Sequence, residues 1–358
     1  MGKKHIFYAG PSLLPQPVYE EAAAAVTDFA GTSVSVLSTG HRTPQWGALM
    51  EETSALWREL LEIPSDYEVL FLAGGASMEF LRVPFNLLEH RAGYLDTGVW
   101  ASKALKEAQG IGEAYAVASS ADRGYDYVPK GFEIPSDLDY LHITTNNTIY
   151  GTEIREDMQC PVPLVADMSS DILSRPVEIS RYALVYGGAQ KNAGTAGVSF
   201  VIVRRDVLGH VSRHIPTLLD YRKHIEGKSM VNTPPVFSIF VMNRTLHWIK
   251  SKGGVSVLHR ENVRKAGTLY SEIERNSLFR ATADPRDRSV MNVRFELLPE
   301  FGHLEDEFLN YAESQDIVGI KGHRTVGGFR ASIYNACSQE DVDALVNCMK
   351  TFEIKHIR

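Results

Sequence analysis

The stretch Tyr182-Ala183-Leu184-Val185-Tyr186-Gly187-Gly188-Ala189-Gln190-Lys191-Asn192 joins an apolar run to a glycine-rich turn that carries a lysine. A short apolar run bounded by turn residues is typical of a buried strand. We therefore expect Lys191 to lie just beyond the end of a strand. An earlier apolar run, Pro163-Leu164-Val165-Ala166-Asp167, ends in the same way on an aspartate. Two charged residues thus follow two predicted buried strands.

A lysine and an aspartate that leave neighbouring strands of an α/β chain indicate pyridoxal phosphate chemistry. The amine of Lys191 can form a Schiff base with the cofactor aldehyde. The carboxylate of Asp167 can pair with the protonated pyridine nitrogen and keep the ring an electron sink. The alternative is that Lys191 is a solvated loop lysine and Asp167 a strand-end cap, because most charged residues are simply exposed.

The composition bounds the class of protein. The chain has 358 residues, of which 44% are hydrophobic and 23% charged, as in an ordinary globular enzyme with room for two domains. The formal net charge of -7 argues against nucleic acid as a main partner, because phosphate backbones need a basic surface. An anion-binding site in this chain must therefore be a local cluster of cations.

The cysteines and the N-terminus indicate a cytoplasmic protein. The three cysteines Cys160, Cys337 and Cys348 match neither a zinc spacing nor a disulfide framework, which fits a reducing compartment. No apolar segment follows Met1 as in a signal peptide, and no run approaches the length of a membrane span. His210 and His214 lack the glutamate of a zinc protease helix, so we expect no metal and no membrane contact.

Most of the chain alternates between predicted strands and helices. Such alternation predicts βαβ units and a mostly parallel sheet. The glycine-rich turn before residue 197 predicts that the last strand is a reversed edge strand. The expected strands are 68–72, 93–96, 140–145, 164–167, 183–186 and 197–203. The expected helices are 20–29, 44–62, 77–88 and 101–109.

Two helices are expected at 237–252 and 254–276, and after residue 276 the pattern changes. Helices are then expected at 304–315 and 340–352, with strands at 288–297 and 327–332. The sequence therefore predicts an α/β fold with a mostly parallel central sheet in a large domain, residues 16–255. Residues 1–15 and 256–358 are expected to form a smaller α+β domain.

Five candidate positions fall just beyond the carboxyl ends of the predicted strands. They are Ala76/Ser77, Trp100, Thr148, Asp167 and Lys191. Open parallel sheets bind ligands at this edge. The helix expected at Ser77 follows two glycines, and its free amides could bind a phosphate. Taken singly, each position has a plainer explanation: a turn, a packing tryptophan or a strand-end cap.

A second group of candidates is cationic. His41-Arg42 lies in a loop between the first two helices, His323-Arg324 follows a glycine, and Arg330 begins the next strand. Arginines form forked bonds with carboxylates and phosphates. A single His-Arg pair is usually a surface feature, and the sequence alone does not show that these pairs converge.

Several longer segments resemble the phosphoserine aminotransferase family of the fold-type I pyridoxal phosphate enzymes. The resemblance runs nearly end to end. The segments that carry it are Gly10-Pro11, Ser38-Thr39-Gly40-His41-Arg42, Ala166-Asp167-Met168-Ser169-Ser170, Gly188-Ala189-Gln190-Lys191-Asn192, Asn232-Thr233-Pro234-Pro235 and Lys321-Gly322-His323-Arg324 up to Arg330.

The resemblance implies a role for each candidate. Lys191 would carry the cofactor and move the substrate proton, Asp167 would pair with the ring nitrogen, and Trp100 would stack on the ring. Thr148 would bond the ring hydroxyl side. The cofactor phosphate would be held by Ala76, Ser77 and Gln190, and by Asn232 and Thr233 of the neighbouring subunit in an obligate homodimer. Arg330 would bind the substrate α-carboxylate, and the distal phosphate or carboxylate would be bound by His41, Arg42, His323 and Arg324.

The resemblance also implies an activity, the transfer of an amino group between glutamate or 2-oxoglutarate and 3-phosphohydroxypyruvate or O-phosphoserine. This reaction would serve serine biosynthesis. A second role in pyridoxine biosynthesis is left open. Alternatives are a related class V aminotransferase for another small keto acid, a silent pyridoxal-binding regulator, and a purely structural domain. The chain departs from many relatives at Ala9 and at Ala76-Ser77, where Gly-Arg is frequent, so amides and the Ser77 hydroxyl must hold the phosphate.

Overall fold

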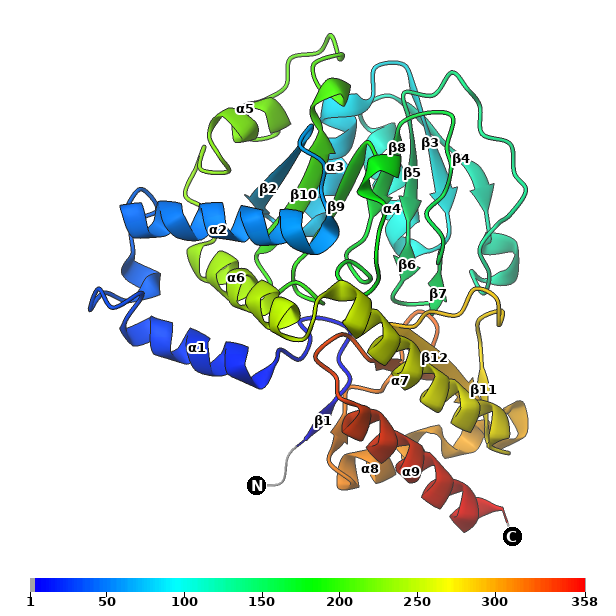
Figure 1. Cartoon of the computed structure of the whole chain (residues 1–358). Helices are drawn as coiled ribbons and strands as arrows, with labels where there is room; N and C mark the ends of the chain where they lie inside the picture. The colour runs from blue at the N-terminus through cyan, green and yellow to red at the C-terminus, as the bar shows by residue number, and fades with distance from the viewer. Residues whose placement is uncertain (1–3, 358) are drawn as a thin grey trace.

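A central sheet with helices on both faces forms the larger part of the molecule, and a smaller antiparallel sheet lies beside it (Figure 1). The computed structural model describes residues 4–357. The helices of the larger part are α1 (Gln16–Thr27), α2 (Pro44–Leu61), α3 (Ala76–Leu87), α4 (Val99–Gln109), α5 (Tyr221–Glu226) and α6 (Val236–Ser251). Its strands are β2 (Tyr67–Ala73), β3 (Arg91–Asp96), β4 (Glu113–Ser119), β5 (Tyr140–Thr144), β8 (Leu164–Asp167), β9 (Leu184–Gly188) and β10 (Val198–Arg204), with a short hairpin of β6 (Asn146–Asn147) and β7 (Thr152–Glu153).

The C-terminal part is built around a three-stranded antiparallel sheet. Its elements are α7 (Val255–Arg275), β11 (Phe279–Ala281), β12 (Asn292–Leu297), α8 (Glu305–Ser314), β13 (Ile317–Val318), β14 (Phe329–Ser332) and α9 (Gln339–His356). The N-terminal strand β1 (His5–Ile6) pairs with β13, so both ends of the chain belong to this region. Short 3-10 turns occupy Val36–Ser38, Ala121–Arg123, Ile179–Arg181, Arg205–Val207 and Pro299–Leu304.

The central sheet has the strand order β2-β10-β9-β8-β5-β3-β4. Strand β10 runs antiparallel to both of its neighbours, and the other strands are parallel to one another. The expected α/β fold with a mostly parallel sheet is therefore confirmed, and so is the reversed direction of β10.

The expected edge position of β10 is wrong. Strand β2 pairs with it along the whole length of Tyr67–Ala73, so the edges of the sheet are β2 and β4. All residues of β10 from Val198 to Val203 are buried. A strand that is apolar on both faces is typical of a central position, whereas an edge strand keeps one side polar.

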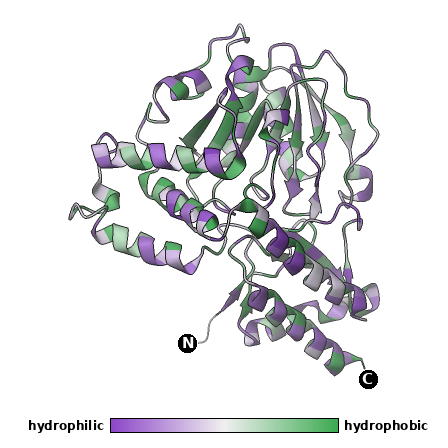
Figure 2. Cartoon of the chain, viewed as in Figure 1, coloured by the Kyte–Doolittle hydropathy of each residue, from purple (hydrophilic) through white to green (hydrophobic). Residues whose placement is uncertain are grey.

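Two layers of helices cover the sheet. Side chains from α1, α2 and α6, including Trp46, Trp57 and Phe240, share one hydrophobic core with one face of the sheet. Side chains from α3 and α4, with Tyr221 of α5, form a second core on the opposite face. The strands of the central sheet are mostly hydrophobic, and the outer helices alternate between hydrophobic and hydrophilic stripes (Figure 2).

A third hydrophobic cluster belongs to the C-terminal part. It joins Phe7 to side chains between Ala266 and Phe352 and includes a group of packed phenylalanine rings, Phe279, Phe295, Phe308 and Phe329. This separation of cores supports the expected division into residues 16–255 and residues 1–15 with 256–358. The domain boundaries themselves stay a prediction.

Most element boundaries lie within a few residues of the expected ones, but six strands were not expected. Strand β4 is rich in alanine, which has a low β-propensity, and β1, β6, β7, β11 and β13 are too short to show periodicity. Within residues 4–357, no helix combines the length and apolar character that crossing a membrane requires.

Candidate active site

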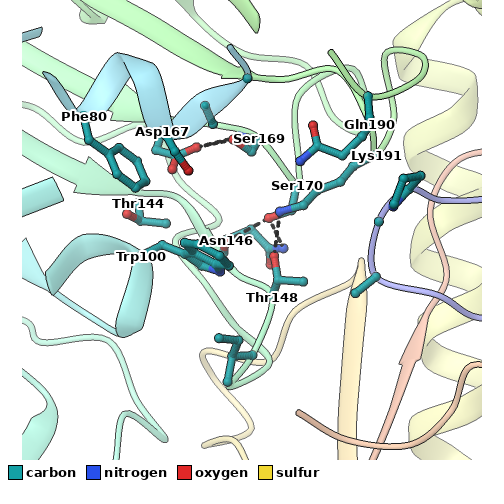
Figure 3. A pocket seen from close by; sticks show the side chains of 18 of the residues that line it. Phe80, Trp100, Thr144, Asn146, Thr148, Asp167, Ser169, Ser170, Gln190 and Lys191 are labelled. Carbon is teal, nitrogen blue, oxygen red and sulfur yellow. Dashed lines mark hydrogen bonds between the residues drawn. The ribbon is translucent and has the colours of Figure 1, made fainter. Parts of the chain in front are cut away.

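A cavity of about 630 Å³ opens at the carboxyl ends of the parallel strands. All five positions expected at this edge line it: Ala76 and Ser77 after β2, Trp100 after β3, Thr148 after β5, Asp167 at the end of β8 and Lys191 after β9. Figure 3 shows four of them, Trp100, Thr148, Asp167 and Lys191, around one space, with Lys191 reaching in from one side and Asp167 and Trp100 on the other. The topology thus brings together residues that are far apart in the sequence.

Lys191 reaches the cavity from the turn that follows β9. Its Nζ donates a hydrogen bond of 2.9 Å to Oγ1 of Thr148 (Figure 3). Burial lowers the pKa of the amine to about 8. The charge of Asp167 acts in the opposite direction, and the charge of Arg330 lowers the pKa further. At pH 7 about a tenth of this amine is therefore neutral, far more than for an ordinary lysine, and the neutral form is what a nucleophile or base requires.

Asp167 is the last residue of β8 and is 5% exposed. Its Oδ1 accepts hydrogen bonds from the backbone N of Ser169 at 2.9 Å and from the Ser169 hydroxyl at 2.6 Å. Burial raises the pKa of the carboxyl, whereas Ser169 and Lys191 lower it. Among the described residues, none donates a hydrogen bond to Oδ2, so this oxygen is available to a donor in the cavity.

The turn between β2 and α3 presents backbone amides to the cavity. Helix α3 begins at Ala76, and its N-cap residue, Gly75, offers no side chain to its first amides. Gly74 and Gly75 have φ angles of 114° and 65°, which favour glycine. Ala76, Ser77 and Gln190 all line the cavity here. Free amides at the positive end of a helix are suited to a phosphate group.

Trp100 and Phe80 provide the aromatic surface of the cavity. Trp100 lies in the first turn of α4, and its Nε1 is buried without a hydrogen-bond partner. On the rim, the ammonium group of Lys103 lies 4.8 Å from the centroid of the Trp100 ring. A flat ring in this cavity would therefore have an indole beside it and the Asp167 carboxylate at its edge.

Of the expected cationic residues, only Arg330 and His323 line the cavity. Arg330 is half-buried, and its Nη1 donates to the backbone oxygen of Thr148 at 3.2 Å, whereas its buried Nε has no partner. Burial lowers the pKa of His323, and the charges of Arg330, Arg324 and Lys103 lower it further. An anion would be attracted to this group of positive charges.

Five other expected residues lie outside the cavity lining of this single chain. His41 and Arg42 precede α2, Arg324 occupies the exposed turn before β14, and Asn232 and Thr233 are exposed ahead of α6. Within the described residues of this chain, the predicted binding set is therefore only partly assembled.

Sequence reasoning missed several residues that line the cavity. They are Phe80, Thr144, Asn146, Ser169 and Ser170. Ser169 and Ser170 directly follow Asp167, and Thr144 pairs with Asp167 across β5 and β8, so their closeness to strand ends was a usable signal. Ala9, Gly10 and Pro11 also line the cavity; only the family resemblance had singled them out, because no strand-end pattern marks the N-terminal segment.

The cavity fits pyridoxal phosphate on its own chemistry. Its partly neutral lysine amine matches the aldehyde of that cofactor, and its carboxylate oxygen without a donor matches the ring nitrogen. The indole surface matches the ring, and the uncapped helix amides match the phosphate. Lys191, Asp167, Trp100 and the Gly74–Ser77 turn are the residues that would hold it.

Comparison with known proteins agrees with this chemistry. The family model for class V aminotransferases matches residues 5–345. A phosphoserine aminotransferase of Bacteroides fragilis is 56% identical, over 99% of this chain and all of its own length, and that of Porphyromonas gingivalis is 52% identical over 99% of this chain and all of its own.

Solved structures agree as well. A phosphoserine aminotransferase from Bacillus circulans subsp. alkalophilus superposes with a TM-score of 0.95 at 42% identity, covering 99% of both chains. A pyridoxal-phosphate-bound phosphoserine aminotransferase from Trichomonas vaginalis superposes with a TM-score of 0.93 at 35% identity, covering 97% of this chain and 100% of its own. By its sequence along nearly its whole length and by its fold, this chain belongs to the phosphoserine aminotransferase family of the class V aminotransferases.

Proposed function

We propose that this protein is a pyridoxal-phosphate-dependent transaminase that transfers an amino group between glutamate or 2-oxoglutarate and 3-phosphohydroxypyruvate or O-phosphoserine, in serine biosynthesis. The observation that carries the proposal is the meeting of Lys191, Asp167 and Arg330 in one cavity at the sheet edge. A role in pyridoxine biosynthesis and a cytoplasmic location stay predictions from the sequence.

The cofactor, when bound, supplies a ring that withdraws electrons from the substrate α-carbon. Side chains of the protein move the proton and hold the charges in place. Nζ of Lys191, with its pKa lowered to about 8, accepts the α-proton and returns it, and its hydrogen bond to Thr148 orients it. The Asp167 carboxylate, held by Ser169, would supply a negative charge to the ring nitrogen of the bound cofactor. The buried surroundings exclude water and strengthen both interactions.

Substrate selection is assigned to the cationic groups. Arg330 is suited to the α-carboxylate, because it is the arginine among the residues that line the cavity and a guanidinium can form forked bonds with a carboxylate. His323, with Arg324 nearby, is suited to the distal anion, which is a phosphate in O-phosphoserine and a carboxylate in glutamate. A small keto acid without a distal anion would leave these charges unpaired, which disfavours the alternative substrate class.

We further assign the active form to a homodimer with shared sites. Asn232 and Thr233 are exposed and lie outside the cavity of their own chain, as do His41 and Arg42. In the dimer, Asn232 and Thr233 would reach the cofactor phosphate of the partner. His41 and Arg42 would complete the distal anion site.

The first test is the substitution Lys191→Ala. We expect turnover to fall below detection and the visible absorbance of the bound cofactor to disappear, because no other described amine lines the cavity. The absorption spectrum, recorded with and without O-phosphoserine, measures both effects. Lys106→Ala, which removes an exposed lysine of α4, serves as the control. An active, coloured Lys191→Ala protein would rule out the proposed function.

The pH dependence of cofactor capture tests the state of Lys191. Only the neutral amine reacts, so the rate at which apoenzyme takes up cofactor should rise about tenfold per pH unit and level off above a pH of about 8. Stopped-flow absorbance follows the reaction. Asp167→Asn should move the plateau to lower pH, because the Asp167 charge raises this pKa. A rate that keeps rising to pH 10 would contradict the assignment.

Arg324→Ala tests the distal anion site. The KM for O-phosphoserine should increase at least about tenfold, the loss expected for one charge-assisted hydrogen bond, while the dissociation constant of the cofactor stays unchanged. Arg260→Ala, an exposed arginine of α7, is the matched control. An unchanged KM would remove Arg324 from the site.

Hybrid dimers test the shared site. A Lys191→Ala chain and an Asn232→Ala/Thr233→Ala chain should each be nearly inactive alone. Mixed under conditions of subunit exchange, they should recover about a quarter of the wild-type activity, because one site of each hybrid is intact. No recovery would mean that Asn232 and Thr233 do not serve the partner chain.

A further inference from the structure

A buried ion pair lies directly beneath the cavity turn between β2 and α3. Glu79, in the first turn of α3, has an exposed fraction of 0%. Its Oε1 accepts a hydrogen bond of 2.6 Å from Nη1 of Arg82, three residues further along the same helix. A buried carboxylate is costly unless it is paired and hydrogen-bonded, so this pair requires an explanation.

Two more donors complete the surroundings of Glu79. The Ser199 hydroxyl of β10 donates to Oε1 at 2.6 Å, and the Tyr221 hydroxyl of α5 donates to Oε2 at 2.7 Å. Burial, and then the Glu79 carboxylate, raise the pKa of Tyr221, so its hydroxyl stays protonated and donates. One carboxylate therefore joins α3, α5 and the reversed strand β10.

The same groups contact the backbone just before the turn. Nη2 of Arg82 donates to the carbonyl oxygen of Ala73 at 3.1 Å, and the Ser199 hydroxyl lies 3.2 Å from the carbonyl oxygen of Leu72. The turn itself, Gly74–Ser77, has two glycines with positive φ and no side-chain cap. The conformation of the turn is therefore stabilised by the buried groups that contact the end of β2, and not by side chains of the turn itself.

We propose that Glu79 is a positioning residue which, through Arg82 and Ser199, holds the Gly74–Ser77 turn in the conformation that binds the cofactor phosphate. This rests on the proposed function, in which that turn is the phosphate site. Glu79 is not among the residues that line the cavity, so it acts through its neighbours and not by contact with a ligand. Its effect is to set the direction of the amides of Ala76 and Ser77.

The charge of the pair matters as well as its geometry. A phosphate at the start of α3 is favoured by the free amides and the positive end of the helix. An unpaired carboxylate in the first helical turn would repel that phosphate. Because Arg82 neutralises Glu79 at contact distance, the carboxylate can anchor three elements without opposing the anion.

The test compares two ligands of the apoenzyme, pyridoxal 5'-phosphate and pyridoxal, which lacks the phosphate. Their dissociation constants are measured by the visible absorbance of the bound cofactor in wild type, Glu79→Gln and Ser199→Ala. Tyr94→Phe is the matched control, because it removes a buried hydroxyl of the same core that bonds only Tyr140.

The expected result is a loss of phosphate discrimination. In Glu79→Gln, the preference for pyridoxal 5'-phosphate over pyridoxal should fall about tenfold, because the weaker hydrogen bonds of a neutral amide release the turn, and this loss outweighs the attraction of the phosphate to the unpaired Arg82. Ser199→Ala, which leaves the ion pair intact, should show a smaller fall, while Tyr94→Phe keeps the wild-type preference. If the Glu79→Gln protein does not fold, the result for Ser199→Ala alone tests the proposal. Weakening of both ligands by the same factor, or an unchanged preference in both variants, would overturn the proposal. A wild-type protein without any preference for the phosphorylated ligand would instead overturn the phosphate site itself.

Discussion

The enclosure of the Lys191 amine is the constraint on which the other features of the site depend. Burial makes the charged ammonium unfavourable, and Arg330 adds a second positive charge nearby. Asp167 compensates from the neighbouring strand, and Thr148 accepts the remaining hydrogen bond. Without the carboxylate, the amine would lose its proton at a still lower pH. The balance of these charges keeps Lys191 reactive near neutrality.

Thr148 connects the two parts of the molecule at this site. Its hydroxyl accepts from Lys191 of the larger part, and its backbone oxygen accepts from Arg330 on β14 of the C-terminal part. The Lys191 amine and the expected carboxylate-binding Arg330 are thereby both hydrogen-bonded to one turn, the one that follows β5. The N-terminal segment adds a further tie, since the Ser12 hydroxyl donates to the backbone oxygen of Lys191 at 2.6 Å.

Local patterns in the sequence were sufficient to predict which residues lie at the strand ends. Apolar runs that end in Asp167, or in a glycine turn before Lys191, indicate strands, and parallel strands must end at one edge. The same logic placed Trp100, Thr148 and Ser77 correctly at the cavity. It did not place β10 inside the sheet: the apolar character of Val198–Val203 on both faces was the local signal of a central strand, but the identity of its partner β2, far away in the sequence, has no local signal. The support of Asp167 by Ser169 and of Glu79 by Tyr221 was missed because a hydrogen bond depends on side-chain direction, which periodicity does not report.

The sequence by itself determined the class of fold, the alternation that creates a binding edge, and the lysine and aspartate that stand on it, because burial patterns repeat with the period of each element. Only the tertiary structure decided which cations join that edge. It brought Arg330 and His323 to the cavity and left His41, Arg42, Arg324, Asn232 and Thr233 outside the lining of the single chain. Residues in turns have no periodicity, and their positions follow from how separately folded parts pack against each other.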